Sequence, residues 1–176
     1  EELAALYPNV SVMTLRRDLA ALEEEGTIIR VRGGARINTQ NIGPAEDIYS
    51  RREISNIEAK NVICGKALAF LEEKRSIFFD SGTTVMTLAK QMPDQNLVLF
   101  TAAPNIAMDI VARTTQPQVT LLGGSLSRTT FSCSGHLPLE YLRSINIDSA
   151  FMATSAFSLE NGFTSGNPYE SEIKAE

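Results

Sequence analysis

The chain has 176 residues, 43% of them hydrophobic, and a formal net charge of −5 at pH 7, which suits a globular protein with one good core and a small appended module. The acidic balance argues against wholesale coating of nucleic acid, although a local cluster of Lys and Arg is still compatible with DNA binding. No apolar run approaches the length of a transmembrane helix and no signal peptide is visible, which argues against membrane insertion and secretion.

Cys64, Cys133 and the single histidine, His136, have no spacing typical of a metal site or a disulfide framework. We therefore expect no metal, no cofactor and a location in the reducing cytoplasm. The chain begins at Glu1 rather than Met and stops at Glu176 in what reads as a helix, so we expect a fragment.

Residues 9–35 are the most informative stretch of the chain. Ser11 is a good N-cap for a short helix, and Gly26 is a good C-terminal stop. Residues 27–36 then read as a β-branched, arginine-bearing hairpin. This order is the one that a winged helix-turn-helix requires to dock on DNA.

A helical wheel places Leu15, Leu19 and Leu22 on the core face of this helix and the arginines away from it. The N-terminal half of a recognition helix enters the major groove, and wing arginines reach the backbone or the minor groove. The alternative is that Arg16 and Arg17 are ordinary solvated residues on the helix surface, with Asp18 as a local ion-pair partner. The expected DNA-contacting residues are Ser11, Met13, Thr14, Arg16, Arg17, Arg30, Arg32 and Arg36.

This stretch resembles the DNA-binding signature of the DeoR family of bacterial transcriptional regulators. The matching pattern is Ser-x-x-Thr-Leu-Arg-Arg-Asp-Leu, followed by Leu-Glu, Gly, Arg and Gly-Gly-Ala. Arg32 departs from the pattern, because the family often carries histidine there. The resemblance implies a winged helix-turn-helix over residues 1–36 whose first helix would precede Glu1, since residues 1–7 look like only its second helix.

Residues 37–57 are polar, contain Gly43 and Pro44, and read as a linker. A helix is expected from about Asn56 to Glu73, with Ile63, Ala67 and Phe70 on one face.

From Ser76 onward, short apolar strands alternate with helices, which predicts a parallel sheet wrapped by helices in an α/β domain over residues 58–176. The strands are expected at 76–79, 97–101, 119–122 and 149–153, and the helices at 85–91, 105–113 and 137–144.

The turn at residues 80–84, Asp-Ser-Gly-Thr-Thr, lies between a strand and a helix. Ligands of open α/β sheets bind at the carboxyl ends of strands, and free N–H groups at a helix N-terminus suit an anion. The turn therefore suggests a phosphate-binding site, although a turn that merely caps its helix is the commoner case.

Neighbouring strand ends carry small or hydroxyl residues, which leaves room for a ligand: Thr101, Gly123, Gly124 and, shortly afterwards, Arg128 and Gly135. The pattern from about residue 57 onward resembles the DeoR effector domain. That domain is similar in fold to the ribose-5-phosphate isomerases and glucosamine-phosphate deaminases. The family senses phosphorylated sugars or related metabolites and generally loses operator affinity when they bind.

The family's terminal Glu-Ala-x-x-Lys motif corresponds to residues 170–174, although Ser171 replaces the alanine. The resemblance makes Lys174 a cation for the effector phosphate and Glu170 a hydroxyl acceptor. The alternative is an ordinary i, i+4 helix ion pair between the two. The family commonly has Thr-Asn where this chain has Thr101 and Ala102, so we expect one polar contact to the sugar to be missing here. The expected effector-binding residues are Asp80, Ser81, Gly82, Thr83, Thr84, Thr101, Gly123, Gly124, Arg128, Gly135, Glu170 and Lys174.

These observations favour a repressor of a carbohydrate operon that binds operator DNA as a homo-oligomer, a dimer or a tetramer, and is released by a phosphorylated sugar. The alternative is an isomerase or deaminase with a fused helix-turn-helix, for which Asp80, Asp148 and Glu170 are the available acids and bases. A protein-interaction module that uses the winged helix without DNA is a third possibility. The resemblance also leads us to expect further strands and helices beyond Glu176.

Overall fold

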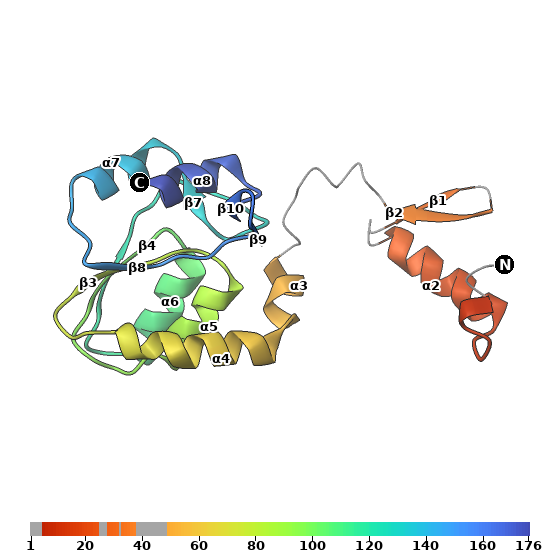
Figure 1. Ribbon diagram of the computed structural model, residues 1–176, viewed down its shortest axis with the longest axis horizontal. Helices are drawn as coiled ribbons and strands as arrows, with labels where there is room; N and C mark the ends of the chain where they lie inside the picture. Colours follow the sequence, from red (N-terminus) through yellow and green to blue (C-terminus); the bar gives the residue numbers. More distant parts are fainter. Residues whose placement is uncertain (1–4, 25–27, 32, 38–48) are drawn as a thin grey trace. The chain divides into compact units, whose positions relative to one another are not determined.

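The computed structural model describes residues 5–24, 28–31, 33–37 and 49–176 (Figure 1). The chain divides into two compact units, Glu1–Ala45 and Glu46–Glu176. The expectations for Gly26, for Arg32 and for most of the linker segment lie outside the described residues.

The N-terminal unit consists of helix α2 (Val12–Glu24) and an antiparallel hairpin formed by β1 (Ile28–Val31) and β2 (Gly34–Ile37). Ser11 caps α2 as the sequence predicted, because its Oγ accepts a 3.1 Å hydrogen bond from the backbone N–H of Thr14. This helix followed by a hairpin is the order of the recognition helix and wing in a winged helix-turn-helix.

The C-terminal unit is built on a four-stranded parallel sheet in the order β5-β4-β3-β8. The strands are β3 (Ser76–Phe79), β4 (Val98–Thr101), β5 (Gln118–Leu121) and β8 (Ser149–Phe151). The chain adds β4 and β5 on one side of β3 and then returns to add β8 on the other side. The strand order therefore reverses between β3 and β8, where open α/β sheets form a crevice for ligands.

Helices cover both faces of this sheet (Figure 1). One face carries α4 (Ile57–Ala67), α5 (Thr83–Gln91) and α6 (Pro104–Arg113), and the other carries α7 (His136–Arg143) and α8 (Pro168–Ala175).

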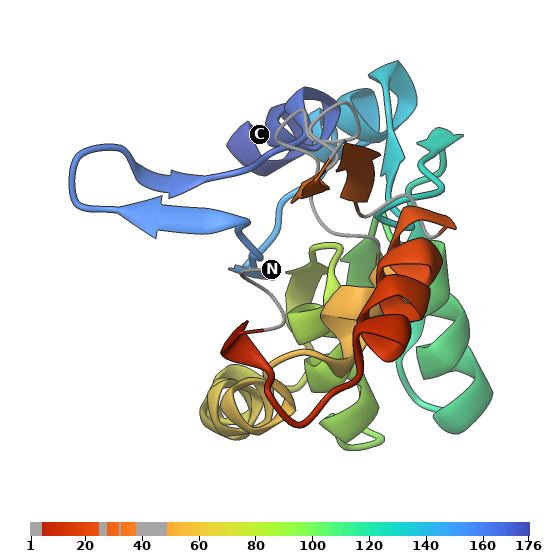
Figure 2. The same cartoon turned by 90° about the vertical axis from the view of Figure 1, so that its right-hand side faces the viewer.

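Short elements complete the unit. Helix α3 (Tyr49–Ile54) occupies part of the segment expected as a linker, and a 3-10 turn, η1 (Leu68–Phe70), follows α4. Two small antiparallel pairs are present, of which the second projects from the unit as a hairpin (Figure 2): β6 (Ser125–Leu126) with β7 (Cys133–Ser134), and β9 (Ala156–Ser158) with β10 (Gly162–Thr164).

Alternation along β3 creates two cores, one on each face of the sheet. Ile77 and Phe79 pack into the cluster that includes α5 and α6, whereas Phe78 packs into the cluster that includes Ile173 of α8. Both faces of the strand are apolar because both are covered, as the continuous apolar runs of the sequence predicted.

The face of α4 that packs on the sheet differs from the expected one. Of the three expected residues, Ala67 packs against the core, but Ile63 and Phe70 are 55% and 70% exposed. Cys64 is buried instead, and Leu68 and Leu71 pack against the same core. The inward position on this helix is therefore occupied by Cys64, a small apolar residue, and not by its neighbour Ile63. Within the described ranges, no helix combines the length and apolarity needed to cross a bilayer.

Candidate functional site

The side chains expected to read DNA lie on the surface of α2. Met13 is 76% exposed, and Arg16 and Arg17 are exposed as well, whereas Thr14 is half-buried beside the cap. The nearest guanidinium–carboxylate approach of Arg17 to Asp18 is 4.0 Å, between side chains that are 80% and 58% exposed. Such a pair contributes little, so it does not prevent Arg17 from contacting a phosphate or a base.

The hairpin register separates the two described wing arginines. Arg30 lies opposite Ala35 and Arg36 lies opposite Ile29, so the two arginines lie on opposite faces of the hairpin. Arg30 contacts α2, where its backbone N–H donates to Glu23 Oε1 at 3.1 Å and its guanidinium lies 3.9 Å from Glu23 Oε2. Arg36 is exposed on the other face.

A pocket of about 360 Å³ opens at the carboxyl ends of β3 and β8, at the reversal in strand order. Six of the expected effector residues lie together in it: Ser81, Gly82, Thr83, Thr84, Glu170 and Lys174. These six residues come from the turn after β3, the first turn of α5 and helix α8, and the segment after β8 adjoins them.

An ion pair between Asp80 and Lys174 joins these segments at the edge of the pocket. Asp80 Oδ1 accepts from the N–H of Ser81 at 2.7 Å, and Oδ2 accepts from the N–H of Ala153 at 2.9 Å. Lys174 Nζ also donates to the carbonyl of Ala153 at 3.0 Å. The Asp80 and Lys174 side chains are only 5% and 15% exposed. Lys174 is therefore held by a carboxylate of the protein, and its partner is not the i, i+4 glutamate that the sequence suggested.

Glu170 is 4% exposed and faces the pocket from the first turn of α8. Asn167 caps this helix by accepting from the N–H of Tyr169 at 3.0 Å, and its amide donates to Glu170 Oε1 at 3.4 Å. A buried carboxylate at the wall of a pocket is suited to accept hydrogen bonds from ligand hydroxyls.

The turn that begins α5 forms another wall. Gly82 has a φ of 111°, a conformation that favours glycine, and among the described residues no side chain caps the helix that follows. The first turn of α5 thus presents backbone N–H groups beside the hydroxyls of Thr83 and Thr84, as an anion site requires. Cys64 supports the turn from α4, because its thiol donates to the carbonyl of Thr84 at 3.3 Å.

The sequence did not indicate several residues that line the same pocket, namely Arg52, Ser55, Asn56, Lys60, Thr130, Ala153, Thr154 and Ser155. Burial, together with the nearby Arg52 guanidinium, holds the pKa of Lys60 below its ordinary value. The cationic side chains of Arg52 and Lys60 therefore line one wall of the pocket. Arg52 belongs to α3, in the segment expected as a linker, and Lys60 belongs to α4, for which no ligand contact was expected. Only the tertiary packing of α3 and α4 brings them to the sheet edge.

Six expected effector residues do not line this pocket: Asp80, which meets it only through its ion pair with Lys174, and five others that lie elsewhere. Thr101 is buried, and its Oγ1 accepts from the N–H of Ala103 at 3.0 Å. Gly124 has a φ of 104°, and an added Cβ would lie 2.4 Å from the Ser134 carbonyl oxygen, so its role is to allow the close approach of two loops. The other three are Gly123, Arg128, which is exposed, and Gly135, which precedes α7.

Two further candidates also lie away from the pocket. Asp148 is at the amino end of β8, where its Oδ2 accepts from the N–H and the hydroxyl of Ser76 at 2.8 and 2.9 Å. These bonds hold the pKa of Asp148 below its usual range. His136 is 76% exposed and lies 3.0 Å from Glu140 on α7. In the part of the chain that the structure describes, no three His, Cys, Asp or Glu side chains are grouped to hold a metal ion.

Residues 1–41 match the family model of the DeoR-like helix-turn-helix domain, and residues 55–176 match that of the DeoR C terminal sensor domain. The chain is 34% identical over 165 residues to the HTH-type transcriptional regulator GlpR of Haloferax volcanii, with 93% of this chain and 63% of that protein covered.

Two further relatives are similar. The HTH-type transcriptional regulator GolR of Listeria innocua is 32% identical over 167 residues, with 94% of this chain and 65% of that protein covered. A lactose phosphotransferase system repressor of Staphylococcus epidermidis is 32% identical over 148 residues, with 84% and 59% covered. The chain thus spans a little under two thirds of the length of these relatives.

Proposed function

This chain belongs to the DeoR family of transcriptional regulators, and we propose that it binds operator DNA and is released from it by a phosphorylated sugar. The observation that carries the proposal is the pocket at the strand-order reversal, with an uncapped helix start and two cations on one side and buried carboxylates on the other. A sugar phosphate has the same division, an anion at one end and hydroxyls at the other.

The phosphate would lie against the first turn of α5, where the Thr83 and Thr84 hydroxyls adjoin the helix N-terminus and Lys60 supplies a positive charge. The hydroxyls of the sugar would face Glu170 and the Asp80–Lys174 pair. We assign Lys174 to this end because Asp80 already neutralises its charge. Thr101, Gly123, Gly124, Arg128 and Gly135 are left out of the proposed contacts because none of them lines the pocket.

Regulation of DNA binding would follow from differential affinity. An effector that binds better to the arrangement with misplaced DNA-binding units shifts the population away from the operator-bound state. Because half-sites of an operator are related by symmetry, we propose that the regulator acts as a homo-oligomer in the cytoplasm and represses a carbohydrate operon. Relatives named as regulators and as a repressor support this assignment.

We propose that the protein is not an enzyme. Of the three acids available to an isomerase, Asp148 lies at the amino end of the sheet and Asp80 is occupied by Lys174 and two backbone N–H groups. Only Glu170 lines the pocket, and one carboxylate does not supply both a positioned acid and a positioned base. Purified protein is therefore expected to leave sugar phosphates unchanged, and measurable turnover of any one of them would favour the enzyme alternative.

The testing experiment is a thermal-shift screen with sugar phosphates and their free sugars. Binding to the native state raises the melting temperature by mass action. One phosphorylated sugar should give a shift that its free sugar does not. Thr83→Ala should reduce this shift and the release from an operator selected from random-sequence duplexes, while Thr87→Ala, one turn further along α5, should change neither. Equal shifts for a sugar and its phosphate would contradict the phosphate assignment.

A further inference from the structure

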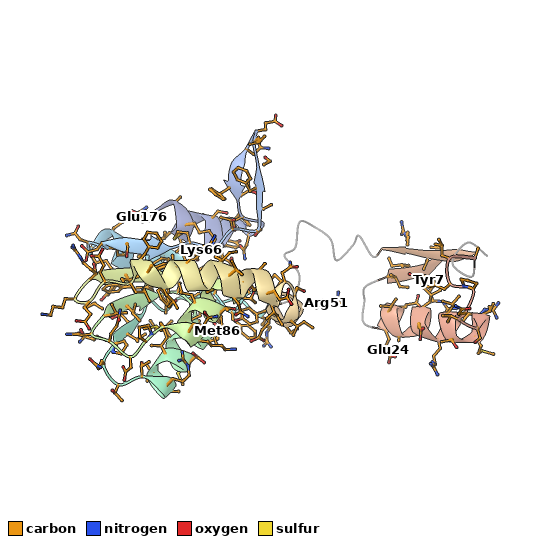
Figure 3. All side chains as sticks on the ribbon, turned by 60° about the horizontal axis from the view of Figure 1, so that its bottom comes forward. Tyr7, Glu24, Arg51, Lys66, Met86 and Glu176 are labelled. Carbon is orange, nitrogen blue, oxygen red and sulfur yellow. The ribbon has the colours of Figure 1, made fainter. Side chains whose placement is uncertain are left out.

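Helix α3 forms part of the pocket wall and is also the first described element after the segment that joins the two units. Arg52 lies in α3, and Ser55 and Asn56 follow it directly, all three lining the pocket. Lys60 Nζ donates to the carbonyl of Arg52, so the cationic wall is tied to the backbone of α3. Figure 3 shows Arg51 of α3 at one end of α4 and Lys66 further along it.

Tyr49, the first residue of α3, anchors the helix to the sensor unit. Its side chain is 5% exposed, its hydroxyl accepts from Asn105 Nδ2 at 2.8 Å, and its N–H donates to the Thr129 carbonyl at 3.1 Å. Its ring packs edge-on against Phe131 with the centroids 5.1 Å apart.

The loop that receives Tyr49 also reaches the pocket. Thr130 lies in sequence between Thr129, whose carbonyl accepts from Tyr49, and Phe131, whose ring packs on Tyr49. Thr130 also lines the pocket. Its Oγ1 is buried without a hydrogen-bond partner among the described residues, so a ligand hydroxyl or phosphate oxygen would satisfy it. A bound effector would therefore contact α3 directly through the cationic wall. It would also contact the loop against which Tyr49 packs, through Thr130.

We propose that α3 transmits the presence of the effector to the DNA-binding unit by remaining docked when the pocket is filled and unwinding when it is empty, an inference that rests on the proposed function. A six-residue helix has no stability of its own, so α3 is helical only while docked. Unwinding it would lengthen the connection to the DNA-binding unit by roughly 10 Å. That length matters on an operator whose half-sites lie about 34 Å apart. The effector, by holding α3 docked, shortens the reach of each DNA-binding unit.

Hydrogen exchange of the full chain, with and without inorganic phosphate in the tens of millimolar and with chloride as the ionic-strength control, tests the proposal. Phosphate should slow exchange at residues 82–86 and, by at least about threefold, at residues 49–56. Protection of 82–86 alone would overturn the role of α3 and leave the proposed function in place. Protection at neither segment would overturn both, because phosphate would then not occupy the pocket.

A mild variant separates transmission from binding. Tyr49→Phe removes the hydroxyl bond to Asn105 but keeps the ring on Phe131 and does not touch the pocket lining. Phosphate should still protect 82–86 in this variant, while protection of 49–56 should fall by about half or more. Tyr169→Phe, at a side chain that is 64% exposed, is the matched control and should behave as the parent chain. Equal protection of 49–56 in all three proteins would overturn the anchoring role of Tyr49.

Discussion

Replacing Asp80 by asparagine should destabilise the sensor unit strongly while changing its shape very little. The amide keeps an oxygen for the N–H of Ser81, but its NH₂ group would face two donors, the N–H of Ala153 and the Lys174 ammonium. The ammonium would then remain in a site where its side chain is 15% exposed, without its carboxylate. Removing one partner of a buried ion pair costs about 3–5 kcal/mol.

This cost translates into a large change in melting temperature. Residues 46–176 form the unit that unfolds, and roughly 130 residues carry an unfolding entropy of about 0.27 kcal/mol/K. The melting temperature of Asp80→Asn should therefore fall by roughly 11–18 °C, measured by calorimetry or by circular dichroism.

Two further variants control for the loss of one carboxylate. Asp109→Asn removes the acid of an i, i+4 pair on α6, whose two side chains are 35% and 19% exposed, and should cost under about 1 kcal/mol. Combining Asp80→Asn with Lys174→Met removes the unpaired charge and should recover part of the lost stability. A drop for Asp80→Asn no larger than that for Asp109→Asn would refute the structural role of the buried pair.

Three other outcomes are expected. Gly124→Ala should destabilise the unit by about 3 kcal/mol in a denaturant titration, since its Cβ would meet a carbonyl oxygen at a positive φ. Gly65→Ala, in the last turn of α4 with open space around it, should stabilise the unit by about 0.5–1 kcal/mol. Operator affinity should fall steeply as the salt concentration rises, and a flat dependence would exclude phosphate contacts. Arg17→Ala should lower both the affinity and the slope of log affinity against log salt concentration, whereas the control Arg75→Ala should change neither. The pKa of Asp148 is lowered in the fold, so its stabilisation is present at neutral pH and is lost as the pH falls through the usual aspartate range towards the folded pKa. Asp148→Asn should therefore flatten the acid side of the stability profile, and parallel profiles would contradict this.

Much of the local structure could be predicted because its causes are local. The Ser11 cap, the apolar runs of β3 and β4 and the glycine turn after β3 depend on residues only a few positions apart. The boundaries of the predicted strands therefore lie within two residues of the observed ones. Periodicity was less informative for α4, where the choice between Ile63 and Cys64 as the inner residue depends on what lies beneath the helix.

The sequence by itself determined the order of the main strands and helices, and it was enough to propose which helix reads DNA and that the turn at residues 80–84 begins a ligand site. Tertiary structure decided which distant residues meet there, because the reversal of strand order brings α8 back beside β3 and pairs Lys174 with Asp80. It also brought Arg52 and Lys60 to the pocket and took Thr101 and Gly124 away from it. Chain topology and packing set such meetings, and neither is encoded in the spacing of residues along one segment.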